Sequence, residues 1–200
     1  AFATGLTLLH AEPDKAFEAR RRLRELIAFA AAVGAPLVTI GSFRGRLASS
    51  GMGARESLAS LLHEAGELAA QQGVRIALEP LNRYETDVIH TAEQGLAFLA
   101  EVGHPAVGLL LDTYHVNIEE RSWSEPFHRL LVAGALWHVH LGDNNRLPPG
   151  QGLIDFCSIV CALREGGYDG FLSAELLAKP DPDAAAEETV RYMRGLLRDA

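Results

Sequence analysis

The sequence predicts an α/β fold, a parallel sheet covered by helices, and two observations predict it. Short apolar, strand-like runs alternate with longer amphipathic helical patterns along the whole chain. Glycine stands between a helical pattern and the next strand candidate, where a helix C-cap belongs, at Gly34, Gly73, Gly103 and Gly167. Repeated strand–helix units require parallel strands, because each helix returns the chain to the same edge of the sheet.

The elements follow one another in a regular order. Helical patterns span residues 14–33, 54–72, 91–102, 123–132, 153–166 and 183–198. Strand candidates precede them at residues 2–8, 36–41, 74–79, 107–112, 135–141 and 170–175. No linker or low-complexity tract divides the chain, and 200 residues suffice for one core. We therefore expect residues 1–200 to form a single domain.

A closed barrel is favoured over an open sheet. No GxGxxG motif follows a strand candidate, which disfavours an open nucleotide-binding sheet. A complete barrel of eight strand–helix units needs about 250 residues. The chain has about six units and begins without Met inside a strand-like segment. These features predict a (β/α)8 or TIM barrel that lacks its first two units in this chain.

Composition limits the classes of partner. The formal net charge is −8, which disfavours a nucleic-acid partner. The one basic run, residues 20–24, is flanked by Glu18 and Glu25 and is typical of a solvated helix face. No apolar run is long enough to cross a membrane and no secretory signal is present, so we expect no membrane partner and a cytoplasmic location. Cys157 and Cys161 share a helical pattern and are expected in the core.

Four consecutive strand candidates end in a residue type that binds metals: Glu79, Asp112, His140 and Glu175. The carboxyl ends of parallel strands meet at one rim, so these side chains are expected to share a site. His140 is favoured over His138 because it lies nearer the end of its strand. Three neighbouring carboxylates repel one another unless a cation lies between them. One imidazole without a thiolate suits Mn²⁺, Mg²⁺ or Co²⁺ better than a structural Zn²⁺.

A family resemblance rests on the segments EPLNRYET, LLDTYHVNIEE, HVHLGDNNRLPPGQG and SAELL. Together they resemble the sugar isomerase and epimerase family with a xylose-isomerase-like barrel, in particular its ketose 3-epimerases. The resemblance implies one divalent metal ion, with Mn²⁺ the first choice and Mg²⁺, Co²⁺ or Zn²⁺ the alternatives. It implies Glu79, Asp112, His140 and Glu175 as the metal ligands. Similar enzymes are often dimers or tetramers, so a homodimer or homotetramer is expected.

The same resemblance assigns further roles. Glu79 and Glu175 would be the catalytic acid and base on opposite faces of the substrate, and Glu85, His115 and Arg146 would contact its carbonyl end. The segment GSFRGR is similar to that of keto-gluconate epimerases and places Arg44 in a rim loop, where it would suit a substrate carboxylate or phosphate. The substrate expected is a free sugar or a sugar acid.

The predicted function is C3 epimerisation of a ketose or keto sugar acid through a cis-enediolate. A positioned base contributes about 10² to 10⁴-fold, and metal stabilisation of the developing oxyanion adds several kcal/mol. Two alternatives use similar chemistry: a metal-dependent lyase of the inosose dehydratase type and an aldose–ketose isomerase of the hydroxypyruvate isomerase type. A related endonuclease is disfavoured by the net charge, and a non-enzymatic binding barrel would bind no divalent metal.

Overall fold

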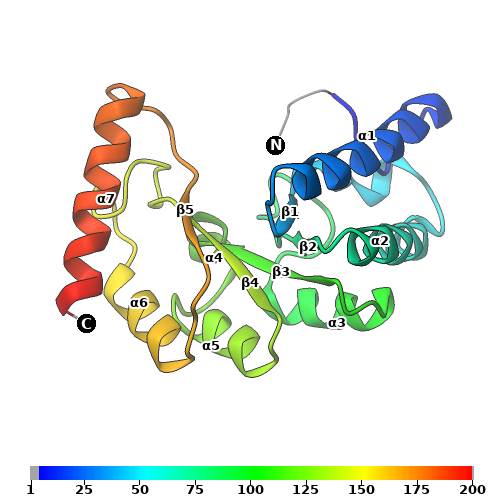
Figure 1. The fold of residues 1–200 in the computed structure, drawn as a ribbon. Helices are drawn as coiled ribbons and strands as arrows, with labels where there is room; N and C mark the ends of the chain where they lie inside the picture. The colour runs from blue at the N-terminus through cyan, green and yellow to red at the C-terminus, as the bar shows by residue number, and fades with distance from the viewer. Residues whose placement is uncertain (1–4, 200) are drawn as a thin grey trace. The chain divides into compact units, whose positions relative to one another are not determined.

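The computed structural model describes residues 5–199, and its internal contacts group the chain into two compact units, one up to Leu109 and one from Leu110. The boundary falls inside strand β3 (Val107–Asp112). The described residues contain one five-stranded sheet in the order β1-β2-β3-β4-β5 (Figure 1). This sequential order is the one that repeated strand–helix units produce.

The first unit contains α1 (Pro13–Ala32), β1 (Leu37–Ile40), the 3-10 helices η1 (Ser42–Arg44) and η2 (Leu47–Ser49), α2 (Ala54–Gln71), β2 (Arg75–Leu78) and α3 (Ala92–Val102). Strand β2 pairs in parallel with β1 and with the beginning of β3. Helix α1 buries Ala19, Leu23, Ile27 and Ala30, which recur at the three- and four-residue spacing of one helix face.

The second unit contains the end of β3, then α4 (Thr113–Glu119), α5 (Glu125–Val132), β4 (Leu136–Leu141), α6 (Phe156–Glu165), β5 (Leu172–Ala174) and α7 (Pro182–Asp199). Strands β4 and β5 pair in parallel, with His140 opposite Ser173. Helix α6 begins at Phe156 because the carboxylate of Asp155 accepts a hydrogen bond from the N–H of Ser158 and caps the helix. The preceding residues, predicted as helix from 153, belong to a loop.

The structure corrects the strand predicted over residues 2–8. Residues 2–4 lie outside the described residues, and residues 5–8 form no strand. Leu9 forms only an isolated parallel bridge with Gly45. Helix α4 was not predicted, because Asp112 both ends β3 and caps the helix that follows without a loop between them. The prediction of a single domain over 1–200 stays a prediction.

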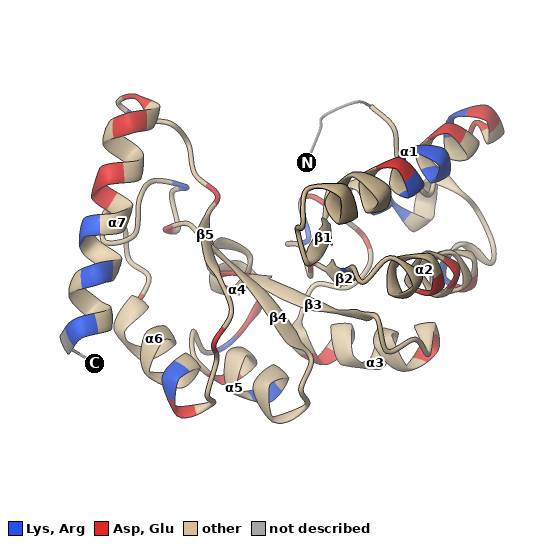
Figure 2. Ribbon diagram, in the orientation of Figure 1, with Lys and Arg blue, Asp and Glu red and all other residues tan. Residues whose placement is uncertain are grey.

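Lys, Arg, Asp and Glu residues are frequent along the helices (Figure 2). The basic run of α1 is a solvated face, as predicted, with Arg21 and Arg22 paired to Glu25 at 2.5 and 3.2 Å. The predicted core position of the two cysteines is wrong, since Cys157 is exposed and Cys161 only partly buried. Within residues 5–199, no helix combines the length and the apolar character needed to cross a membrane.

Candidate metal centre

Glu79 follows directly on β2 in the first unit. Its N–H donates to the carbonyl oxygen of Ile40 at 3.0 Å, so pairing with β1 continues one residue past the strand. Pro80 has no N–H and cannot extend the ladder. Glu79 is only 6% exposed. Gly41 leaves the space for its carboxylate, because a Cβ atom at position 41 would collide with Glu79 Oε2.

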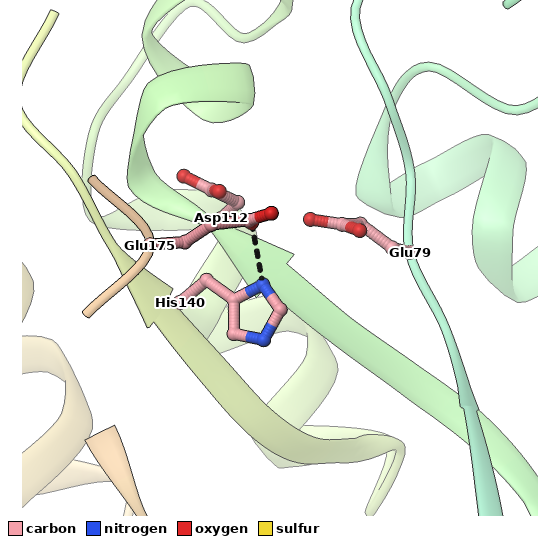
Figure 3. Close-up of side chains that lie close together, drawn as sticks. All are labelled: Glu79, Asp112, His140 and Glu175. Carbon is pink, nitrogen blue, oxygen red and sulfur yellow. Dashed lines mark ion pairs between the residues drawn. The ribbon is translucent and has the colours of Figure 1, made fainter. Parts of the chain in front are cut away.

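The other three candidate ligands lie at strand ends of the second unit. Asp112 ends β3, and its Oδ1 accepts a hydrogen bond from the N–H of Tyr114 at 2.8 Å. Glu175 follows β5, and its N–H donates to the carbonyl oxygen of Leu141 at 2.9 Å. His140 lies in β4 with its Nδ1 3.0 Å from Glu175 Oε2, the pair dashed in Figure 3. Backbone pairing thus fixes the positions of His140 and Glu175, and the cap on α4 orients the side chain of Asp112.

Glu175 is a carboxylate at neutral pH. Hydrogen bonding from His140 is the main cause that lowers the pKa of Glu175 to about 2, and Asp112 and Arg146 lower it further against the effect of partial burial. His138 contacts the ring of His140 edge to face, with the ring centroids 5.1 Å apart, and its Nε2 is 2.9 Å from the hydroxyl of Ser173. Burial, and then the neighbouring His140, lower the pKa of His138 to about 4, so its imidazole is neutral.

The four predicted ligands offer one donor atom each, and these atoms lie within 4.8 Å of one another (Figure 3). The donors are three carboxylates and one imidazole, and no cysteine takes part. Oxygen-rich sets with a single imidazole suit Mn²⁺ and Mg²⁺ and tolerate Co²⁺ and Zn²⁺. Glu79, Asp112 and His140 are shielded from solvent to differing degrees, whereas Glu175 is half exposed. The residues present therefore fit a divalent cation.

Arg146 brings a positive charge to the same strand ends of the second unit. Its Nη1 donates to Asp112 Oδ2 at 2.5 Å and to the carbonyl oxygen of Glu175 at 3.1 Å. Its Nη2 lies 3.3 Å from His115 Nε2, and its guanidinium stacks on Tyr114 at 4.3 Å. The predicted substrate-contacting residues Arg146 and His115 are therefore neighbours. His115 is buried, with an exposed fraction of 2%.

Glu85, also predicted to contact substrate, is exposed in the loop after β2. Its Oε1 accepts a hydrogen bond from Asn82 Nδ2 at 2.9 Å. Asn82 is buried, and its Oδ1 also accepts from the N–H of Tyr84 at 3.0 Å. The loop thus holds Glu85 through a buried amide, a contact that the sequence did not indicate.

Arg44 differs from its predicted place at a rim. Its residue exposure is 0%, and its guanidinium donates to backbone carbonyl oxygens rather than facing solvent. The acceptors include Glu79, Val88 at 3.0 Å and Ile89 at 3.3 Å. Burial lowers the pKa of Arg44 to about 10, while nearby carboxylates, Glu79 foremost, oppose that change. Arg44 is therefore a buried cation, a position that disfavours the predicted contact with a substrate anion.

Asp143 has a role that sequence reasoning missed. It is fully buried, and its two carboxylate oxygens accept hydrogen bonds from four backbone N–H groups, those of Asn144, Gly150, Gly152 and Ile154, at 2.8 to 3.1 Å. The loop it organises carries Arg146, whose φ of +60° lies in the left-handed region. An Asp at the head of a segment rich in Asn, Pro and Gly was the available signal.

The fold and the donor set define a parallel α/β protein with a candidate divalent-metal centre at its strand ends. A family model described as "Xylose isomerase-like TIM barrel" matches residues 1–196, and the chain belongs to that family. The predicted fold class is confirmed by this match and by the strand order of the described residues. The predicted lack of the first two strand–helix units stays a prediction.

Named relatives are sugar epimerases. The chain is 37% identical over 147 residues to an L-ribulose 3-epimerase of Methylomonas sp. (strain DH-1), an alignment that covers 73% of this chain and 50% of the relative. It is 32% identical over 143 residues to a 3-dehydro-D-guloside 4-epimerase of Escherichia coli (strain K12), covering 71% of this chain and 54% of the relative. The chain thus spans about half the length of the curated relatives it matches.

A solved relative has the same fold. The crystal structure of D-allulose 3-epimerase from Methylomonas sp. in complex with D-allulose superposes with a TM-score of 0.83 at 25% identity. The match covers 96% of this chain and 73% of that one. Epimerases are isomerases, so the named relatives all belong to that class of enzyme.

Proposed function

We propose that the protein containing this chain is a metal-dependent sugar epimerase that inverts C3 of a ketose or a keto sugar acid. The observation that carries the proposal is the group of Glu79, Asp112, His140 and Glu175, whose ligand atoms lie within 4.8 Å of one another. The names of the relatives support the class of reaction and a sugar as the substrate. In this proposal the four residues hold one divalent ion, with Mn²⁺ the first choice.

When bound, the ion would polarise the substrate carbonyl and stabilise negative charge on its oxygen. Glu175 is proposed as the base, because its half-exposed carboxylate is more accessible to a substrate than that of the buried Glu79. As base it takes the proton from C3, and the electrons of that C–H bond form the C2–C3 double bond of a cis-enediolate. Glu79 would then deliver a proton to the opposite face of C3, and exchange with solvent would return both carboxyl groups to their starting states.

Arg146 and His115 are proposed to bind the carbonyl end of the substrate. Arg146 already donates to Asp112 and lies beside His115, so a substrate oxygen would meet donors held in place before it arrives. Glu85 is proposed to contact a neighbouring hydroxyl group from the loop after β2.

The test is incubation of the purified protein with Mn²⁺ and a panel of ketoses and keto acids in D₂O, followed by NMR. Deuterium at C3 together with a second ketose supports the proposal. Deuterium at C4 of a 3-keto sugar would assign the reaction named for the Escherichia coli relative. Loss of water would indicate the lyase alternative, and an aldose product the isomerase alternative.

Two variants test the roles of the glutamates. Glu79→Gln and Glu175→Gln should each lower deuterium exchange by at least about 100-fold, since each removes a proposed acid or base. Glu125→Gln, which changes an exposed carboxylate on α5, is the matched control and should exchange at the wild-type rate. Wild-type exchange in either test variant would contradict the assignment. Absence of Mn²⁺ binding by the wild type would contradict the proposal as a whole.

A further inference from the structure

The guanidinium of Arg44 donates its hydrogen bonds inside the first unit. The side chain has no exposed surface, and it donates to the carbonyl oxygens of Gly41, Glu79, Val88 and Ile89. A buried guanidinium is costly unless such acceptors satisfy it. The planar fork of Arg can reach several acceptors at once, which a single ammonium group cannot do in the same way.

The acceptors of Arg44 lie at both ends of one loop. Glu79 begins the segment after β2, and Val88 and Ile89 lie near its end, nine and ten residues later. Glu85, the exposed carboxylate held by Asn82, lies between them. One side chain therefore closes the loop that carries two of the residues assigned to the reaction.

The end of this loop adopts a backbone conformation that needs support. Ile89 has a φ of +62°, which is unusual for a β-branched residue. Its carbonyl oxygen accepts hydrogen bonds from Arg44 Nη2 at 3.3 Å and from the N–H of Leu81 at 3.2 Å. These contacts offset the strain, so removal of the Arg44 guanidinium should release the loop at this point.

The neighbouring residues reinforce the same connection. The carboxylate of Asp87 accepts from the N–H groups of Leu47 and Ala48 at 2.7 and 2.9 Å, and Arg46 Nη2 donates to the carbonyl oxygen of Tyr84 at 2.7 Å. The segment GSFRGRL is thus bound along the loop after β2. Its arginines contact backbone carbonyl oxygens, and Arg44 does so out of reach of solvent.

We propose that Arg44 is a positioning residue for Glu79: by holding the carbonyl oxygens at both ends of loop 79–89, it fixes where the Glu79 carboxylate stands. This inference rests on the proposed function, in which Glu79 is a metal ligand and acid. The predicted role of Arg44 in binding a substrate anion stays a prediction.

The test compares Arg44→Met and Arg44→Lys with Arg164→Met as the matched control, because Arg164 is exposed and donates to one carbonyl oxygen, that of Leu197, outside loop 79–89. Hydrogen–deuterium exchange read by mass spectrometry reports loop mobility, and electron paramagnetic resonance reports the Kd for Mn²⁺. Both are measured at a temperature where thermal unfolding shows each variant fully folded.

For Arg44→Met, we expect amide exchange in residues 79–91 to accelerate at least about tenfold with residues 143–154 unchanged, and the Mn²⁺ Kd to rise about 10 to 100-fold. Arg44→Lys should recover part of both losses, and Arg164→Met should change neither by more than about twofold. A folded Arg44→Met protein with wild-type exchange and wild-type Mn²⁺ affinity would overturn the proposal.

Two further outcomes distinguish a failure of the proposed function from a failure of the role proposed for Arg44. If the wild type binds no Mn²⁺, the proposed function fails, and exchange in residues 79–91 alone decides whether Arg44 positions the loop. If Arg44→Met does not fold, amide exchange and the Mn²⁺ Kd are measured on Arg44→Lys instead. Wild-type values in that variant would show that the planar guanidinium is not required and would overturn the proposal. A fall in thermal stability with unchanged Mn²⁺ affinity would make Arg44 merely structural and would also overturn the proposal.

Discussion

The loop after β2 and the loop after β4 are each organised by one buried ion, and the two ions have opposite signs. In the first unit Arg44 collects backbone carbonyl oxygens, whereas in the second unit Asp143 collects backbone N–H groups. A loop has no neighbouring strand that forms regular hydrogen bonds with its backbone N–H and carbonyl groups. A buried charge can satisfy several such groups at once, and its sign decides whether the loop turns its donors or its acceptors inward.

The largest effect should come from Asp143→Ala. This change leaves four backbone N–H groups without their charged acceptor, and we expect the free energy of unfolding to fall by about 4 kcal/mol. Urea denaturation followed by circular dichroism measures the loss. Asn144→Ala is the control, because its side-chain oxygen accepts only from the N–H of Leu153 in the same loop, at 2.9 Å. Equal losses in the two variants would remove Asp143 from the comparison.

A smaller effect should follow from Asp87→Asn in the loop after β2. Asp87 also accepts from two backbone N–H groups, but it is exposed, so water can replace the lost contact. We expect a loss of about 1 kcal/mol or less in the same urea experiment. Asp183→Asn, an exposed change in the first turn of α7, should cost below about 0.5 kcal/mol. A loss for Asp87→Asn as large as that for Asp143→Ala would show that burial does not explain the difference.

The smallest effect concerns a neutral donor, Tyr168, whose hydroxyl donates to the carbonyl oxygen of Phe171 at 2.9 Å. Burial, and then the charge of Asp169, raise the pKa of Tyr168 to about 12 from the ordinary value of 10. The folded state therefore holds the phenolic proton more tightly than the unfolded state does. The stability that this provides is complete below pH 10 and is lost as the pH rises through about 12.

Tyr168→Phe should therefore be less stable than the wild type at pH 8, by about 0.5 kcal/mol for the lost hydrogen bond. Between pH 10 and 12 the two urea midpoints should converge, because only the wild type loses the contribution of this proton. A constant gap over that range would mean that the hydroxyl titrates normally in the folded protein.

Much of the fold was predictable because its periodicity is strong. Helices such as α2 and α3 begin and end within a residue of the predicted limits, since a glycine follows each amphipathic pattern within two residues. The strand-end residues were predictable as a group, because parallel strands deliver their last side chains to one edge of a sheet. Their joint action on a metal and a sugar remains the proposal that the experiments above test.

The supporting residues were not predictable from the sequence. Whether Arg44 faces solvent or backbone depends on which carbonyl oxygens the loop after β2 turns toward it. That loop is distant in sequence, since its acceptor Val88 lies 44 residues after Arg44. The same holds for Asp143, whose partners gather only after its own loop has folded back. Local patterns report burial of apolar side chains, whereas a buried charge reports long-range backbone geometry.

Gly41 has a consequence for engineering this protein. A single methyl group at position 41 would enter the space of the Glu79 carboxylate, yet that carboxylate belongs to another strand end. Libraries that randomise the mouth of the barrel to change sugar preference should therefore leave codon 41 fixed. Substitutions there would displace the carboxylate of Glu79, so under the proposed function they would lower activity on every substrate and resemble a change in specificity.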